Sequence, residues 1–152
     1  MPRRGAATPS LRREGERGTG SAWAWAWARE AVCYGTSPEG IPGNDDAGTL
    51  SAWYVFSAMG FYPVAGADLY VVGSPLFPRV EVQLAGGLLV IEAPAASRDN
   101  VYVQSLTLNG QPVTVPWFRH ADIAAGGTLH FELGAKPSTW GVVAAGTPFG
   151  QR

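Results

Sequence analysis

The stretch GIPGNDDAGTLSAWYVFSAMGFYP, residues 40–63, joins a glycine-rich polar loop to the clearest helical pattern in this sequence. Over Thr49–Met59 the large apolar residues recur at the three- and four-residue spacing of a helix, and Gly60 stands where a helix commonly ends. The spacing therefore predicts a helix over Thr49–Met59, entered from the Asn-Asp-Asp loop of residues 44–46.

Two segments precede this stretch. Residues 1–20 are rich in Arg, Gly and Glu, and this composition buries too little apolar surface to order itself, so a disordered basic tail is expected. Residues 21–34 alternate Trp with Ala, a pattern that fits a strand as well as a helix. Ser21 as a cap and Gly35 as a stop favour the helix. Its three tryptophans are either core residues or a platform for stacking sugars.

The residues after the Thr49–Met59 helix show strand patterns instead. Asn109-Gly110 between two apolar runs is the strongest short hairpin signal in the chain. Strands are expected over residues 80–84, 88–92, 101–108, 111–115 and 128–133. The prediction is an α+β fold. A helical part over residues 21–63 is followed by an antiparallel β unit of about five or six strands over residues 64–145, and the chain ends in a tail over residues 146–152. Leu50, Trp53 and Tyr54 are expected to pack the helix against this unit.

Composition excludes several classes of function. The net charge of −1 gives no basic surface for a nucleic acid, and no apolar run approaches the roughly 18 residues that span a bilayer. Cys33 is the single cysteine, so neither an intramolecular disulfide nor a cysteine-ligated zinc is expected. The short apolar run over residues 22–28 is not a credible signal peptide, because Arg29 and Glu30 interrupt it.

Asp45 and Asp46 are the side chains most suited to chemistry. Adjacent carboxylates repel each other, so the pKa of one should rise unless a cation or the amides of the helix N-terminus compensate. Either residue can therefore be a helix cap or a general base, and the residues alone leave both roles open. Partner acids are harder to find: Glu81, Glu92 and Glu132 fall on predicted strands and are expected to face solvent. Four further candidates have no motif around them, namely Glu30, Glu39, His120 and His130.

The whole run of residues 40–63 closely resembles the most characteristic stretch of glycoside hydrolase family 92, the calcium-dependent exo-acting α-mannosidases. Three further motifs match in order: Gly-Ser-Pro-Leu-Phe-Pro at 73–78, Ser-Leu-Thr-Leu-Asn-Gly at 105–110, and the Gly-Gly-Thr-Leu strand that begins at 126. Trp140-Gly141 fits the family's usual ending. The resemblance covers residues 29–141 and implies that the helical part comes from the end of an (α/α)6 barrel.

The resemblance also implies a function and its residues. Members remove terminal mannose from α-linked glycans, often on glycoproteins, with inversion and a bound calcium. Asp46 corresponds to the general base, Asn44 to a group that positions water, and Asp45 lies between them with a less defined catalytic role. Asn44 and Asp46 are also possible contributors to the calcium site, whose hard cation prefers oxygen ligands.

The resemblance leaves much of a complete enzyme without a counterpart in these residues. The N-terminal β-sandwich, most of the barrel and the glutamate that acts as acid are not matched, and they are expected on another chain if the site is complete. Alone, the chain is expected to be inactive; the alternative is a non-catalytic truncated remnant or a carbohydrate-binding β module. Members are usually secreted or periplasmic, but the location of this chain is left open.

Overall fold

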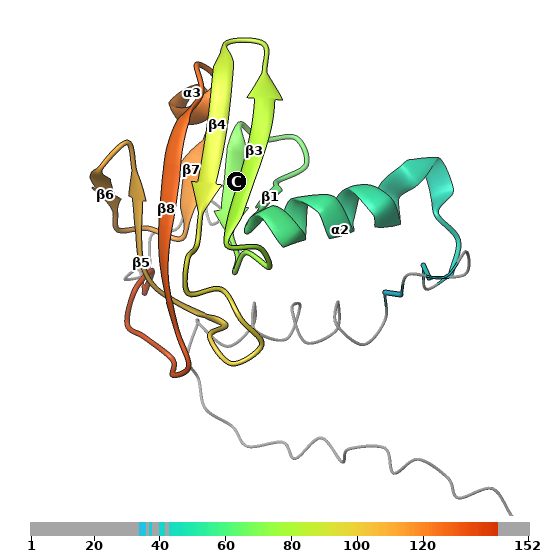
Figure 1. The fold of residues 1–152 in the computed structure, drawn as a ribbon. Coiled ribbons are helices and arrows are strands. Elements are labelled where there is room, and N and C mark those ends of the chain that lie inside the picture. Colours follow the sequence, from blue (N-terminus) through green and yellow to red (C-terminus); the bar gives the residue numbers. More distant parts are fainter. Residues whose placement is uncertain (1–33, 36, 38–39, 42, 143–152) are drawn as a thin grey trace, which may run out of the picture.

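The computed structural model describes residues 34–35, 37, 40–41 and 43–142 (Figure 1). The predicted basic tail, the helix predicted over residues 21–34 except for Tyr34, and the tail over 146–152 lie outside the described residues. Within them no helix is both long enough and apolar enough to cross a bilayer.

The described chain has an α+β fold in which one long helix precedes two sheets. The elements, in order, are η1 (Asp46–Gly48), α2 (Thr49–Met59), β1 (Phe61–Pro63), β2 (Leu69–Val72), β3 (Arg79–Leu84), β4 (Gly87–Glu92), β5 (Tyr102–Leu108), β6 (Gln111–Val113), β7 (Trp117–Arg119), α3 (His120–Ile123) and β8 (Gly127–Gly134). The helix predicted over Thr49–Met59 is confirmed with both ends as expected. Gly60 ends it in the left-handed conformation at a φ of 91°, where its amide donates to the carbonyl of Ser57.

The strands form two sheets rather than one antiparallel unit. A three-stranded sheet has the order β1-β2-β7, and a five-stranded sheet has the order β3-β4-β8-β5-β6. The five strands predicted over residues 80–133 are all present, as β3, β4, β5, β6 and β8. The prediction missed β1, β2 and β7, because they are short and carry no alternating pattern long enough to be seen. The turn at Asn109-Gly110 is confirmed: both residues have positive φ, 51° and 78°, as a two-residue hairpin of this type requires.

The purely antiparallel arrangement is also wrong, because β4 and β8 run parallel, with Leu89 opposite Gly127 and Ile91 opposite Leu129. Two glycine dipeptides, Gly86-Gly87 and Gly126-Gly127, allow β4 and β8 to lie side by side. A Cβ on Gly86 would lie 2.2 Å from the carbonyl oxygen of Ala124, and one on Gly126 would lie 2.6 Å from that of Leu88. The sequence marks both glycine pairs as turns, but their shared role is to let the starts of two distant strands approach.

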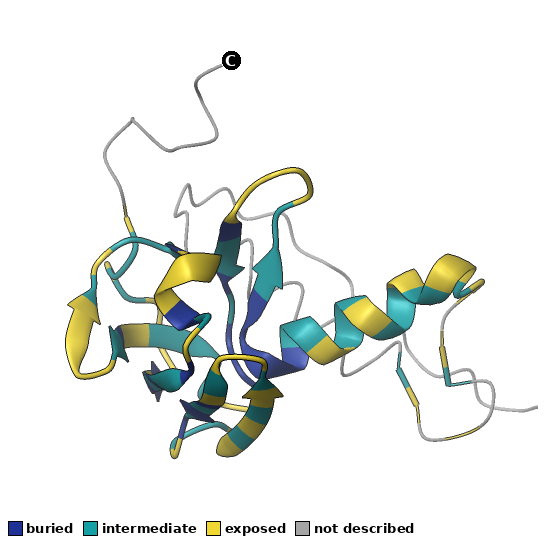
Figure 2. Cartoon of the chain, turned by 90° about the horizontal axis from the view of Figure 1, so that it is seen from above, coloured by how far each residue is buried: buried dark blue, intermediate teal, exposed yellow. Residues whose placement is uncertain are grey.

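One apolar core joins the two sheets and the inner end of α2. The five-stranded sheet contributes alternate residues of β4 and β8, such as Ile91 and Phe131, which are fully buried. Phe61 and Phe118 enter from the three-stranded sheet, and their rings meet edge to face at 5.4 Å. Figure 2 shows the buried residues gathered between the sheets and the outer end of α2 largely outside them.

Helix α2 touches this core only through its C-terminal part. Ala58 and Met59 are its buried residues, and Phe56 packs partly buried against Phe61. The expectation that Leu50, Trp53 and Tyr54 pack on the β unit is wrong, because they lie further out along α2; the rings of Trp53 and Tyr54 contact Tyr34 instead. The rest of the helix extends away from the sheets (Figure 1).

Candidate functional site

The loop before α2 holds its two aspartates in different ways. Oδ1 of Asp45 accepts the amides of Leu50 and Ser51 at 2.8 and 3.1 Å, and its Oδ2 accepts the hydroxyl of Ser51. These amides belong to the first turn of α2, where donors have no partner within the helix. Asp45 therefore acts as the cap of this helix, although Gly48 stands at the formal N-cap position.

The electrostatic effect on Asp45 follows from these bonds. The Ser51 hydroxyl, followed by the Ser51 amide, lowers the pKa of Asp45 below its usual value, against an opposing effect of burial. Asp45 thus needs no cation to stay ionised, because helix amides and a hydroxyl stabilise its carboxylate. Ser51 is a supporting residue that the sequence pattern did not single out. Its position three residues after Gly48, where a capping side chain finds its donor, was the available signal.

Asp46 has no such role, and its carboxylate is exposed. Among the described residues no hydrogen bond or ion pair reaches it, and only its backbone carbonyl is engaged, by the hydroxyl of Thr49 at 2.6 Å. The next residue, Ala47, adopts a left-handed conformation with a φ of 54°, followed by Gly48 with a φ of 74°. A non-glycine residue in this region costs about 1–2 kcal/mol, and such strain is concentrated at functional sites.

The base of the loop is also ordered by local contacts. The amide of Gly35 donates to the carbonyl of Gly40 at 2.8 Å, and the amide of Gly40 donates to the carbonyl of Ser37 at 2.9 Å. Just before this turn, the hydroxyl of Tyr34 donates to the carbonyl of Leu50 at 3.2 Å. The two ends of the loop that carries Asp45 and Asp46 are therefore held together. Asn44 lies in the loop, exposed, immediately before them.

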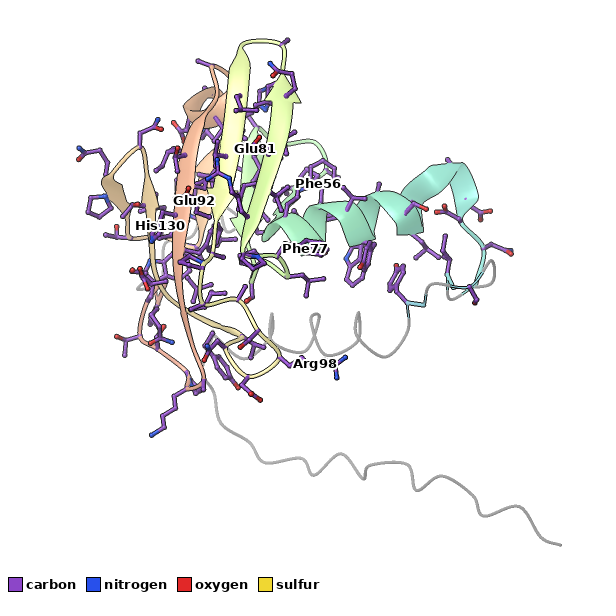
Figure 3. The ribbon with its side chains drawn as sticks, viewed as in Figure 1. Phe56, Phe77, Glu81, Glu92, Arg98 and His130 are labelled. Carbon is purple, nitrogen blue, oxygen red and sulfur yellow. The ribbon has the colours of Figure 1, made fainter. Side chains whose placement is uncertain are left out.

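The glutamates that the sequence offered as acids lie elsewhere. Glu81, Glu92 and Glu132 are on β3, β4 and β8, as predicted, and Figure 3 shows Glu92 close to His130. Asp46 precedes the outer end of α2, which extends away from the sheets. Figure 3 shows Glu81 and Glu92 on the sheet, away from that end of α2, so neither is placed to act as the acid partner of Asp46. Glu30 and Glu39 lie outside the described residues.

The sheet glutamates instead form a charge cluster with their neighbours. Arg79 binds Glu81 at 2.7 Å and Glu92 at 2.5 Å, and His130 lies 3.4 Å from Glu92 and 3.0 Å from Glu132. The hydrogen bond to Glu132 is the main reason that the pKa of His130 is raised. His120, the other candidate, is exposed on α3, 3.0 Å from the hydroxyl of Tyr70. Neither histidine lies near the loop of residues 44–46.

The described residues do not form a calcium site by themselves. Calcium takes six to eight oxygen ligands, and no group of three or more His, Cys, Asp or Glu side chains suited to a metal occurs in the described ranges. Asp45 is already committed to the amides of α2, which leaves Asn44 and Asp46 as exposed oxygen donors at the loop. These two residues could supply only a few of the oxygen ligands that a calcium ion requires.

Residues 20–135 match the model of the glycosyl hydrolase family 92 catalytic domain. The chain belongs to this family. An "Uncharacterized secreted glycosidase" from Arthroderma benhamiae is 36% identical over 106 residues, which are 67% of this chain and 14% of that protein. The family assignment confirms the resemblance that the loop and its neighbouring motifs carry.

Solved structures of family members show the same fold. A GH92 α-mannosidase from Bacteroides thetaiotaomicron is 34% identical with a TM-score of 0.73, covering 78% of this chain and 16% of that chain. A GH92 inverting mannosidase from the same organism is 37% identical with a TM-score of 0.68, covering 76% of this chain and 16% of its own. This chain thus spans about one-seventh to one-sixth of the relatives that it matches.

Proposed function

We propose that this chain supplies the general-base segment of an inverting α-mannoside hydrolase, with Asp46 as the base. The observation that carries the proposal is the contrast between neighbours: Asp45 is bound to the helix, whereas the carboxylate of Asp46 is exposed and unpaired among the described residues. One GH92 relative is described as an inverting mannosidase, and another was solved with mannoimidazole. Both support a mannoside as the substrate.

In an inverting mechanism, Asp46 would carry out one chemical step. A carboxylate base takes a proton from a water as that water attacks the anomeric carbon, while a carboxylic acid across the sugar protonates the departing oxygen. Asp46 is suited to the first task because its loop is fixed at Asp45 and its oxygens are not used for capping. Asn44, two residues earlier, has an amide side chain that can orient the same water.

The acid belongs to a part of the assembly beyond the described residues. We infer that the remainder of an (α/α)6 barrel and an N-terminal β-sandwich, on the same or another chain, complete the pocket around the outer end of α2. The exposure of Val55, at 54%, supports this, because α2 carries no charged side chain and a helix apolar on all sides is normally covered. Calcium is part of the proposal as a cofactor of the complete site.

The test uses a chimera in which residues 20–135 replace the matching segment of the 34% identical α-mannosidase. Asp46→Asn should reduce kcat on an aryl α-mannoside by about 10²–10⁴-fold, the usual contribution of a general base, with KM little changed. Asp45→Asn is the matched control, and it should lower thermal stability more than Asp46→Asn does. Full turnover by the Asp46→Asn chimera would refute the proposal.

A further inference from the structure

The backbone carbonyl of Asp46 is held by two donors that belong to one residue, Thr49. The Thr49 amide donates to this carbonyl, and the Thr49 hydroxyl donates to it as well, at 2.6 Å. That distance lies within the normal range for a hydroxyl donor. The two bonds close a ring over Ala47 and Gly48, so the peptide that follows Asp46 is fixed to the first residue of α2.

The segment inside this ring needs such support. Ala47 has a φ of 54° and a ψ of 24°, and Gly48 has a φ of 74° and a ψ of 17°. An alanine is strained in this left-handed region, and the strain persists only where surrounding contacts hold it. No residue of η1 is buried, so apolar packing does not supply these contacts. Hydrogen bonds at the two ends of η1 therefore have to supply them.

The two ends of η1 are held by different residues. On the side before Asp46, the carboxylate of Asp45 is bonded to the first turn of α2, and the carbonyl of Asp45 accepts the amide of Gly48 at 3.0 Å. On the side after Asp46, the side chain that bonds to η1 is that of Thr49. The carboxylate of Asp46 takes part in none of the bonds that the described residues make here, so it stays available to a water.

The hydroxyl bond of Thr49 also has an ordinary explanation. A threonine in a helix often donates to the carbonyl three or four residues earlier, whatever the residue there does. In that case the loss of the hydroxyl would lower stability and leave the chemistry unchanged. At Thr49, however, the acceptor three residues earlier is the carbonyl of the candidate base, and the strained Ala47 lies between them.

We propose that Thr49 is a positioning residue for Asp46, because its hydroxyl keeps the Asp46 carboxylate in one orientation at the outer end of α2. Thr49 acts through the backbone of Asp46 and touches neither the attacking water nor the mannoside. Removal of the hydroxyl lets η1 leave its left-handed conformation, and the carboxylate moves with the backbone. This role rests on the function proposed above, in which Asp46 is the base.

The first measurement uses the full-length chain and does not depend on activity. The backbone carbon chemical shifts of Ala47 report its left-handed conformation, and Thr49→Val removes the hydroxyl while keeping the branched shape. We expect these shifts to move in Thr49→Val toward the values of an unstrained loop, and to stay at the wild-type values in Thr49→Ser. Thr114→Val, which removes an exposed hydroxyl between β6 and β7, is the matched control and should leave them unchanged. Wild-type Ala47 shifts in Thr49→Val would overturn the proposal.

The second measurement reads turnover in the chimera described above. Thr49→Val should lower kcat on the aryl α-mannoside by about 10-fold or more, because a misplacement of roughly 1 Å can cost about 10²-fold, whereas KM should change little. Thr49→Ser should recover most of this loss, because it retains the donor. Circular dichroism at the assay temperature gives the folded fraction to which kcat is referred, so a destabilised variant still decides the question. An unchanged kcat in Thr49→Val, or an equal loss in Thr49→Ser, would contradict the positioning role.

The Asp46→Asn chimera separates failure of the positioning role from failure of the proposed function. If Asp46→Asn loses turnover and Thr49→Val does not, the positioning role is wrong and the assignment of the base stands. If Asp46→Asn keeps full turnover, the assignment of the base is wrong, and the positioning role falls with it even where the Ala47 shifts respond to Thr49→Val.

Discussion

The carboxylate of Asp45 is hydrogen-bonded to both the hydroxyl and the amide of Ser51, six residues further along the chain. This pairing draws the first turn of α2 and the loop before it into one unit. It also accounts for the difference between two adjacent aspartates: the carboxylate of Asp45 is hydrogen-bonded to the helix, whereas that of Asp46 is free to contact solvent or a substrate. The sequence permits either residue to be the cap, and the hydrogen bonds assign that role to Asp45.

Asp45→Ala should destabilise the chain, as the loss of a helix cap does, because two amides of α2 lose their acceptor. Asp46→Ala should change the free energy of unfolding by much less, since its side chain holds no partner among the described residues. Urea denaturation of both variants measures the difference. Equal losses would show that Asp46 also supports the helix.

The lowered pKa of Asp45 predicts how stability depends on acid. A carboxyl whose pKa falls on folding contributes stability above its unfolded value, about 3.8, and loses it as pH falls through the folded value. The wild-type chain should therefore lose more stability than Asp45→Asn between neutral pH and pH 3. The check is urea denaturation of both proteins across that range. Parallel pH profiles would mean that the Ser51 bonds do not hold in solution.

Gly126→Ala should destabilise the fold more than Gly66→Ala. Both glycines have positive φ, 85° and 74°, so the backbone strain of an alanine is similar at the two positions. Only at Gly126 would the new Cβ meet backbone, 2.6 Å from the carbonyl oxygen of Leu88, whereas nothing lies within 4 Å at Gly66. Thermal unfolding of the pair isolates the cost of the close approach between β4 and β8. An equal loss of stability in the two variants would show that the backbone conformation alone determines the cost.

Local patterns predicted the parts of the fold that are settled locally. The α2 helix follows from its spacing and from Gly60, and the β5–β6 hairpin follows from Asn109-Gly110, because neighbouring residues decide both. The parallel pairing of β4 with β8 joins residues far apart in sequence, such as Leu89 and Gly127, and no local pattern encodes it. The three-residue strands β1 and β7 are too short for alternation to appear, and β2 between them aligns both.

In the candidate site, too, local sequence predicted some features and long-range contacts determine the others. The Gly-Asn-Asp-Asp motif marked the loop, and the glycines at 43 and 48 adopt the positive φ that such a tight entry requires. The supporting contacts of Ser51 and Tyr34 depend on how the loop returns to the helix, which spacing alone does not fix. The roles of Asn44 and Asp46 in catalysis stay predictions of the family resemblance.

The raised pKa of His130 predicts the opposite pH dependence from that of Asp45. A histidine whose pKa rises on folding contributes stability fully below its unfolded value, about 6.5, and loses it as pH climbs through the folded value. His130→Gln should therefore bring the stabilities at pH 5.5 and pH 8 closer together. The effect should be small, because exposed ion pairs contribute at most about 1 kcal/mol and His130 is 36% exposed.

Titration of the His130 imidazole by NMR tests the cause directly: Glu132→Gln should lower the pKa of His130, because it replaces the acceptor that most favours the charged ring. If Glu132→Gln leaves the pKa of His130 unchanged, the shift would be assigned to Glu92, which also binds Arg79.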